Sequence, residues 1–388
     1  MLIVFRQDIK NVKHSSWIEL STLAFNHNIS QFRTFVPSGV KLSIVLKSNA
    51  YGHGLLPMGQ LCEANSSIDY VCVFFLSEAL TLRCHGMTKP ILVLGLLDDS
   101  IELAIEHNID VVCFDRSQLN DFHNAAQKAG KKLFVHLKID TGLSRLGFFP
   151  DQVLSVVQDI VTNYPGIYIK GIMTHFSESG ALDVQWTERQ ERVFTEVIAL
   201  LQSKNINIDM MHASNTGATL RFLGSHFNMV RVGGGSYGLP QRTYVYDLIK
   251  KAVPDFELKQ VLTYKSRIMS IKELPAGSFI SYDRLYQTPR PQRLALAPIG
   301  YSDGFGRRKP AGLHVLINGV LAPVVGSVCM NMTIIDISHI SNVEVNDEVT
   351  AIGDHEGIRV NDIAPLVGCV NYEVTTLLNP ATKRMIVK

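Results

Sequence analysis

The chain has 388 residues, 46% of them hydrophobic and 19% charged, and its formal net charge is +2. This length exceeds that of most single domains, so a large domain and a smaller one are expected. The near-neutral charge, without a dense Lys/Arg stripe, argues against nucleic acid or a membrane surface as a partner. No apolar run approaches the length of a membrane span.

Two further features indicate the compartment. The first ten residues, MLIVFRQDIK, have too short an apolar core and no basic lead-in for a signal peptide. The six cysteines form no CxxC pair, which favours free thiols over disulfides or zinc ligands. The sequence therefore predicts a globular, cytoplasmic protein.

The first part of the chain alternates short apolar runs with longer amphipathic segments. A strand at 17–20 and a helix at 22–35 come first, and eight strands follow, at 42–46, 70–75, 91–94, 111–114, 133–139, 167–174, 208–212 and 229–232. Eight strands alternating with helices fit a (β/α)₈ TIM-like barrel. A doubly wound sheet is the alternative, but it normally has fewer strands, and the first turn lacks its GxGxxG fingerprint.

Beyond about Pro254, strand-like runs follow each other without intervening helices. They lie at 261–271, 293–299, 313–317, 320–325, 332–337 and 348–352, and one helix is expected near 360–367. Asn318-Gly319 between two of these runs is a strong hairpin signal. We therefore expect a barrel domain at 1–252 and a mostly antiparallel β domain at 253–388.

Polar side chains follow several barrel strands, where such barrels build their functional sites. They are Lys47 after the first strand, Lys138 and Arg145 at and after the fifth, His175 after the sixth, Asn215 and Thr216 after the seventh, and Arg231 to Gly235 at the eighth. Any one of them alone would be read as an ordinary surface residue. Together they predict a positively charged pocket for an anionic ligand.

Two of these sets have the character of a phosphate site. Asn215 and Thr216 stand where a helix at 218–222 begins, and the three glycines at 233–235 let backbone amides approach a ligand, although three glycines can also simply form a turn. The chain has no GxxxxGK[ST] nucleotide motif. A lysine at the end of a buried strand, next to such a cradle, points to pyridoxal 5′-phosphate held by Lys47 as a Schiff base.

The stretch SIVLKSNAYGHG at 43–54 resembles the pyridoxal-phosphate lysine motif of the alanine racemase family. The members of this family are fold type III pyridoxal-phosphate enzymes. The resemblance continues in family order in KIDTGLSRLGF (138–148), THFSES (174–179), HASNTGATLRF (212–222), NMVRVGGGSYGL (228–239), ISYDRLY (280–286), IGYSDGFGRR (299–308), VGSVCMNMTIID (325–336) and NYEVTTLL (371–378). The family fold, a (β/α)₈ barrel followed by a β domain, agrees with the fold expected from the strand pattern.

The resemblance implies a role for each matching residue. Lys47 would hold the cofactor and act as one acid/base, and Tyr282 from the partner subunit would act as the second. The cofactor contacts would come from Tyr51, His175, Asn215, Thr216, Arg231, Gly233, Gly234 and Tyr372, with Arg231 facing the pyridine nitrogen. The substrate contacts would come from Arg145, Tyr301 and Met330, and Lys138 and Asn331 would support them. The implied assembly is a homodimer with shared sites, and no metal is implied.

The resemblance predicts the type of reaction more clearly than it predicts the substrate. Asn331 replaces an aspartate usual in the family, and Gly234 replaces a bulkier residue, which would suit a more polar substrate such as serine. The bulk of Tyr301 and Tyr372 restricts the pocket to small side chains. Racemisation of L-alanine to D-alanine is the first hypothesis, and a serine or serine/alanine racemase is the second. More distant alternatives are a barrel-type pyridoxal-phosphate decarboxylase, a non-catalytic cofactor carrier, and a binding protein without a covalent cofactor.

Overall fold

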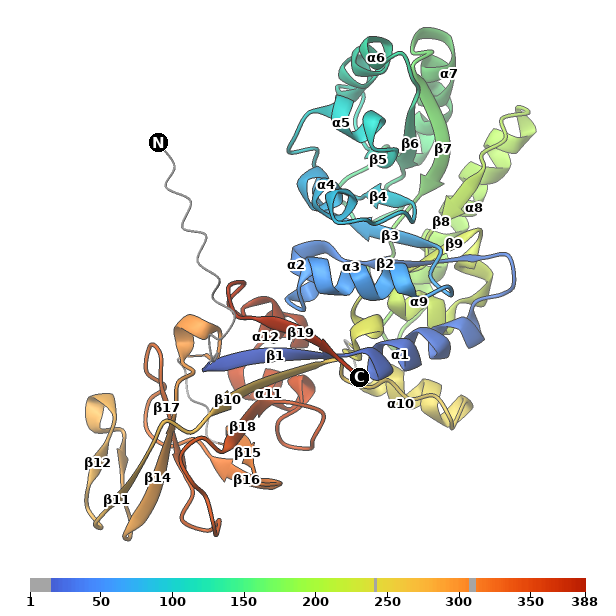
Figure 1. Ribbon diagram of the computed structural model, residues 1–388. Helices are drawn as coiled ribbons and strands as arrows, with labels where there is room; N and C mark the ends of the chain where they lie inside the picture. Colours follow the sequence, from blue (N-terminus) through green and yellow to red (C-terminus); the bar gives the residue numbers. More distant parts are fainter. Residues whose placement is uncertain (1–14, 241–242, 307–311) are drawn as a thin grey trace, which may run out of the picture. The chain divides into compact units, whose positions relative to one another are not determined.

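The computed structural model describes residues 15–240, 243–306 and 312–388, which form two compact units (Figure 1). The barrel unit is Ser21–Val261 together with Lys388. Of the described residues, the β unit contains 15–20 and Leu262–Val387. No helix in the described ranges is long and apolar enough to cross a membrane.

The barrel unit is built around eight parallel strands. They are β2 (Lys41–Val45), β3 (Tyr70–Val73), β4 (Ile91–Val93), β5 (Ile109–Cys113), β6 (Leu133–Lys138), β7 (Ile167–Met173), β8 (Met210–His212) and β9 (Met229–Val232). The strand order is β8-β7-β6-β5-β4-β3-β2-β9, a nearly closed barrel. All eight predicted strands are confirmed, and the barrel is confirmed over the doubly wound alternative.

Helices connect these strands and surround them, as Figure 1 shows for α3 to α8. The helices are α1 (Thr22–Phe35), α2 (Lys47–Tyr51), α3 (Leu55–Ala64), α4 (Leu76–Cys84), α5 (Ile101–Glu106), α6 (Gln118–Ala129), α7 (Val153–Asn163), α8 (Gln185–Ser203), α9 (Thr216–Arg221) and α10 (Thr243–Ala252), with 3₁₀ turns η1 (Pro150–Gln152), η2 (Leu223–His226) and η3 (Gly234–Tyr237). Apolar side chains from the strands form a cluster in the barrel, which includes Val45, Leu92, Val112, Met210 and Met229.

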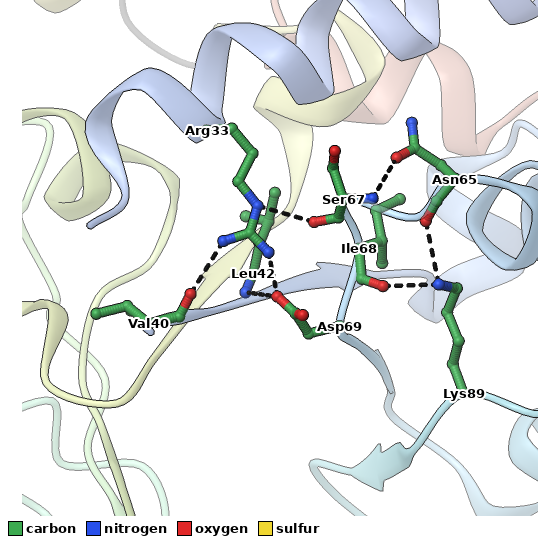
Figure 2. Close-up of polar contacts among 8 residues, drawn as sticks. All are labelled: Arg33, Val40, Leu42, Asn65, Ser67, Ile68, Asp69 and Lys89. Atoms are coloured by element: carbon green, nitrogen blue, oxygen red, sulfur yellow. Dashed lines mark hydrogen bonds and ion pairs between the residues drawn. The ribbon is translucent and has the colours of Figure 1, made fainter. Parts of the chain in front are cut away.

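A polar cluster joins α1 to the starts of β2 and β3 (Figure 2). The Arg33 guanidinium donates to the backbone oxygens of Val40 (2.9 Å) and Ser67 (2.8 Å) and pairs with the Asp69 carboxylate. The same carboxylate accepts from the Leu42 amide at 2.8 Å. One half-buried side chain thus donates to two loop carbonyls and pairs with a carboxylate.

We expect Arg33→Ala to lower the free energy of unfolding by about 2 kcal/mol, because carbonyls and a carboxylate lose a charged donor. The matched control is Arg192→Ala on α8, since Arg192 is exposed and its loss should change stability little. Urea unfolding of both variants measures the difference. Equal stabilities of the two variants would contradict a structural role for the cluster.

The β unit contains the remaining elements. They are β1 (Ser16–Ser21), β10 (Leu262–Arg267), β11 (Ser270–Leu274), β12 (Phe279–Ile280), β13 (Tyr286–Gln287), β14 (Gln292–Ala297), β15 (His314–Ile317), β16 (Val320–Pro323), β17 (Thr333–Asp336), β18 (Glu348–Ile352), β19 (Arg384–Val387), α11 (Val360–Val367), α12 (Asn371–Thr376), η4 (Tyr282–Arg284) and η5 (Tyr301–Asp303). A six-stranded sheet has the order β16-β15-β18-β10-β1-β19, and smaller sheets are β11-β14-β17 and β12-β13. This mostly antiparallel architecture confirms the expected β domain.

The division of the chain differs from the expected boundary at 252/253. Strand β1, expected in the barrel domain, pairs with β10 through Trp17↔Lys265 and Ile18↔Tyr264, and so belongs to the β unit. The barrel unit extends to Val261. The physical reason is that β1 buries Ile18 and Leu20 in a sheet whose other strands lie more than two hundred residues away in the sequence.

Two local expectations have different outcomes. The hairpin at Asn318-Gly319 is confirmed, with φ values of 49° and 77° and with β15 and β16 pairing on either side. The single strand expected at 261–271 is wrong. It is two strands, β10 and β11, because Ile268 and Met269 bond to two different partners, Asp347 and Leu296.

Candidate active site

Lys47 lies at the carboxyl end of β2, and the chain after it has an unusual conformation. Ser48, Asn49 and Ala50 have φ of 53–56° and ψ of 44–54°, a left-handed helical turn without glycine. This conformation costs about 1–2 kcal/mol per residue for L-amino acids. The surrounding structure must therefore hold the turn in place.

Two side chains hold this turn. Glu78 accepts from the Ser48 amide at 2.8 Å through Oε1, and from the Phe74 and Phe75 amides through Oε2. Asn49 Oδ1 accepts from the Leu55 amide at 2.8 Å. Glu78 therefore joins the ends of β2 and β3 directly beside Lys47. Glu78 was not among the predicted site residues, because a glutamate in the first turn of a helix is common and gives no signal of function.

The Lys47 amine lies in a cationic environment. Burial and then the charge of Arg145 lower the pKa of Lys47, while Glu78 opposes this shift. A lowered pKa leaves a larger fraction of the amine unprotonated, and the unprotonated amine is the nucleophilic form. The arrangement therefore suits an amine that reacts with a carbonyl group.

We expect Glu78→Gln to slow attachment of the cofactor to Lys47 and to destabilise the protein by about 1–3 kcal/mol, since one carboxylate serves three backbone amides and its loss loosens the turn that carries Lys47. Loss of the Glu78 charge alone would lower the pKa of Lys47 further and favour attachment, so the slowing measures the loosened turn. The matched control is Glu63→Gln, because the Glu63 carboxylate also accepts from two backbone amides, those of Thr88 and Lys89, but lies beside no site residue. Both variants should lose stability. An equal attachment rate in the two would contradict the role of Glu78 at Lys47.

Three more cations stand at the same end of the barrel. Burial, Arg145 and Arg231 lower the pKa of Lys138 to about 8, although Asp140 opposes this. Asp140 Oδ1 is already engaged by three amides of the loop that carries Arg145, at 2.9–3.0 Å. The predicted excess of positive charge is therefore present around Lys47, Lys138 and Arg145.

Arg231 is buried and held on several sides. Its NH2 donates to the backbone oxygens of Thr174 (2.8 Å) and Ala213 (3.0 Å) and lies 3.3 Å from His175 Nδ1. Burial lowers the pKa of Arg231 to about 10, so it remains a cation at neutral pH. Burial and then Arg231 and Arg145 hold the pKa of His175 well below its usual range, so this imidazole is neutral.

The residues predicted to form a phosphate cradle lie around Gly233. The Thr216 hydroxyl accepts from the Gly233 amide at 2.9 Å, and Asn215 Oδ1 caps α9 through the Ala218 amide at 3.2 Å. A Cβ added at Gly233 would lie 2.5 Å from the Tyr51 hydroxyl oxygen, so only glycine lets the two groups approach. Gly234 follows, buried, at the start of η3.

The remaining predicted residues lie in the β unit. Tyr282 is on η4 with 67% of its surface exposed, and Ser281 anchors this turn through a 2.8 Å bond to Ser327 O. The Tyr301 amide donates to Cys329 O at 3.1 Å, next to Met330, which is 56% exposed.

Asn331 and Tyr372 complete this second set. Asn331 Nδ2 donates to the Ser302 hydroxyl at 2.7 Å, beside Tyr301. Tyr372 is on α12, whose end approaches η5, since a Cβ at Gly304 would collide with the Leu377 backbone. The structure thus gathers the predicted residues into two sets, one within each unit. Arg307 and Arg308 of the IGYSDGFGRR motif lie outside the described residues.

The barrel-unit set fits a phosphorylated aldehyde. It offers an amine with a lowered pKa, neighbouring cations, and two hydroxyls that converge on a glycine without room for a side chain. Among the described residues no group of three or more His, Cys, Asp or Glu side chains could hold a metal ion.

Comparisons with known proteins agree with this geometry. The chain matches the families described as alanine racemase, N-terminal domain, over residues 20–241, and alanine racemase, C-terminal domain, over 261–386. It is 34% identical over 379 residues to an alanine racemase of Methanococcus maripaludis, covering 96% of this chain and 99% of that protein. It is 35% identical over 384 residues to an alanine racemase of Leptospira interrogans, covering 96% of each.

Solved structures give the same result. The alanine racemase of Clostridium difficile 630 superposes with a TM-score of 0.90 at 29% identity, covering 97% of both chains. The alanine racemase of Bacillus anthracis with bound L-Ala-P has a TM-score of 0.87 at 29% identity, covering 97% of this chain and 96% of that one. The chain therefore belongs to the alanine racemase family, whose members are pyridoxal-phosphate-dependent amino-acid racemases.

Proposed function

We propose that this protein racemises L-alanine to D-alanine by a two-base mechanism, with Lys47 acting on one face of the substrate and Tyr282 of the partner subunit on the other. The observation that carries the proposal is the Lys47 amine, which stands at a strand end with a lowered pKa among cations. The relatives in the family bear the name of the same reaction.

The residues of the barrel unit have separate tasks. When bound, pyridoxal phosphate supplies an aldehyde for covalent linkage and a conjugated ring that delocalises the charge left at the α-carbon. The hydroxyls of Tyr51 and Thr216 and the backbone at Gly233 and Gly234 would bind its phosphate. Arg231 would donate to the ring nitrogen, and because a guanidinium only donates, it would keep that nitrogen unprotonated. A ring of this kind favours rapid return of the proton over transamination.

Arg145 would bind the substrate carboxylate, and Lys138 would support it. Lys138 and Arg145 are both cations, and Arg145 contributes to the lowered pKa of Lys138. Loss of a proton from the Lys138 ammonium, followed by addition of CO₂ to the amine with release of a second proton, would give a carbamate anion and turn this repulsion into an attraction. Intact-protein mass spectrometry under non-denaturing conditions would reveal the added mass, and the Lys138→Ala variant is its control.

Racemisation requires an acid/base on each face of the α-carbon, and Lys47 serves only one. Tyr282, Met330 and Leu285 are large side chains left 67%, 56% and 74% exposed, which suits a surface covered by another subunit. We therefore propose a homodimer in which the β-unit set, Tyr282, Tyr301 and Met330, completes the site of the partner.

The protein is proposed to act in the cytoplasm. All six cysteines are free thiols, three of them buried. Free thiols are typical of a reducing compartment.

The experiment that tests this function is a panel of L-amino acids assayed for loss of optical activity and for exchange of the α-proton. Alanine should react fastest. Serine is the second candidate, because Asn331 places a neutral amide bonded to Ser302 where the family usually has a carboxylate. Faster turnover of serine than of alanine would replace the first proposal by the second, and no turnover of any amino acid would refute both.

A further inference from the structure

Four buried polar side chains form a chain through the interior of the barrel. Arg231 on β9 donates from NH1 to His212 Nδ1 on β8 at 2.6 Å. His212 Nε2 lies 2.8 Å from Nδ1 of His136 on β6. His136 Nε2 in turn lies 3.7 Å from the carboxylate Oδ2 of Asp110 on β5, a distance too long for a hydrogen bond but short enough for electrostatic attraction. All four residues are at most 3% exposed.

The protons in this chain have one consistent arrangement. A guanidinium can only donate, so His212 Nδ1 must accept and its proton must be on Nε2. His212 then donates to His136 Nδ1, which places the His136 proton on Nε2, facing Asp110. Burial lowers the pKa of both imidazoles, so both are neutral and each has one donor and one acceptor nitrogen.

The far end of the chain carries a negative charge. Burial alone would raise the pKa of Asp110, but His136 and Lys170 lower it overall. Asp110 Oδ2 accepts from Lys170 Nζ at 2.7 Å and from the Tyr70 hydroxyl. The carboxylate is thus held in place, and it attracts the Nε2 proton of His136.

The barrel backbone makes room for this chain. A Cβ added at Gly171 on β7 would overlap the His136 ring. The register between β6 and β7 shifts between Val135 and His136, where the ring turns inward. These two features indicate that the position of the His136 ring is built into the strands.

We propose that Asp110, His136 and His212 are positioning residues for Arg231. Asp110 and His136 hold His212 in the tautomer whose Nδ1 accepts from the Arg231 guanidinium, and this hydrogen bond orients the guanidinium. This proposal rests on the proposed function, in which Arg231 faces the cofactor ring nitrogen. Backbone carbonyls hold NH2 of Arg231, whereas His212 holds NH1. Losing the correct tautomer of His212 therefore frees one side of the guanidinium.

The first test measures the tautomers directly. Holoenzyme labelled with ¹⁵N in histidine is studied by long-range ¹H–¹⁵N correlation, and the His136→Gln and His212→Gln variants assign the signals. Both rings should be protonated on Nε2 alone at neutral pH. A proton on Nδ1 of His212 in the unmodified protein would overturn the proposal, whatever amino acid the enzyme racemises.

The second test separates positioning from simple stability. His136→Leu leaves the His212 Nε2 proton without an acceptor, so kcat should fall about tenfold with little change in KM. The share of turnovers that end in transamination should rise, because a loosened Arg231 would no longer keep the ring nitrogen unprotonated. His136→Gln offers an acceptor oxygen and should restore part of kcat. Gly171→Ala should resemble His136→Leu, because the added methyl group displaces the His136 ring without removing any polar side chain.

Ser266→Ala is the matched control, because it removes a 2.8 Å bond from a buried hydroxyl to Ser15 O within the β unit, outside the barrel that holds the four residues. It should lower Tm without raising transamination. If His136→Leu lowers Tm but leaves kcat and the transamination share unchanged, the four residues only stabilise the barrel and the proposal is refuted. Absence of racemisation in the unmodified enzyme, with the expected tautomers, would refute the proposed function but not the polar chain of four residues.

Discussion

Replacing Lys47 with Ala should eliminate covalent attachment of pyridoxal phosphate and lower racemisation by at least about 10⁴-fold, because the anchor and one acid/base are lost together. Borohydride reduction followed by peptide mass spectrometry should find the pyridoxyl group on Lys47 of the unmodified protein. The variant should carry none at any lysine, and the panel assay for alanine measures the loss of rate.

Lys41→Ala is the matched control for this experiment, because Lys41 begins the strand that Lys47 follows and lies at its opposite end. This variant should retain the adduct and most of the activity. An adduct on a lysine other than Lys47 in the unmodified protein would refute the assignment of the anchor.

The barrel was predictable because each of its strands is a local pattern. The runs that became β2, β3 and β9 are short and apolar, and parallel strands buried on both faces have this composition. The place of β1 was not predictable in the same way. Its own pattern is that of any half-buried strand, and its partner β10 lies far along the chain. Pairing between strands so far apart in the sequence cannot be recognised from the residues of either strand.

The candidate site residues also differ in whether a local sequence pattern reveals them. Lys47 and the glycines at 233–235 follow strands in a recognisable order, so a cationic, phosphate-binding pocket could be inferred from the residues. The individual roles came from the resemblance to the family. The left-handed turn after Lys47 could not be inferred, because Ser48, Asn49 and Ala50 are not residues that demand positive φ.

The polar residues that follow Arg231 in the barrel interior, His212, His136 and Asp110, could not be predicted as a group from the sequence. His136 and His212 each occupy an ordinary inward position of a strand, 76 residues apart. Only the parallel register, in which His136 aligns with Gly171 and Met173 with His212, brings their rings together. Buried polar pairs of this kind depend on tertiary structure, and composition does not reveal them.

Replacing Tyr282 with Phe should lower racemisation by about 10²–10⁴-fold while leaving the cofactor bound to Lys47, because the variant lacks only the hydroxyl that moves the second proton. Racemisation is measured from each enantiomer of alanine, and the adduct is measured by borohydride reduction. Tyr286→Phe is the matched control, since Tyr286 lies four residues away and its hydroxyl bonds to Gln292 at 3.0 Å. Unchanged turnover in Tyr282→Phe would exclude Tyr282 as a base.

Mixing the Lys47→Ala and Tyr282→Phe proteins tests whether the sites are shared between subunits. In a mixed dimer with shared sites, one site combines both defects and the other combines intact Lys47 with intact Tyr282. Random exchange of equal amounts should therefore restore about a quarter of the normal activity, since half of the dimers are mixed and each has one good site. Native mass spectrometry confirms the exchange. If both bases came from the same chain, every site would lack one of them, so no recovery after confirmed exchange would place Tyr282 in the site of its own subunit.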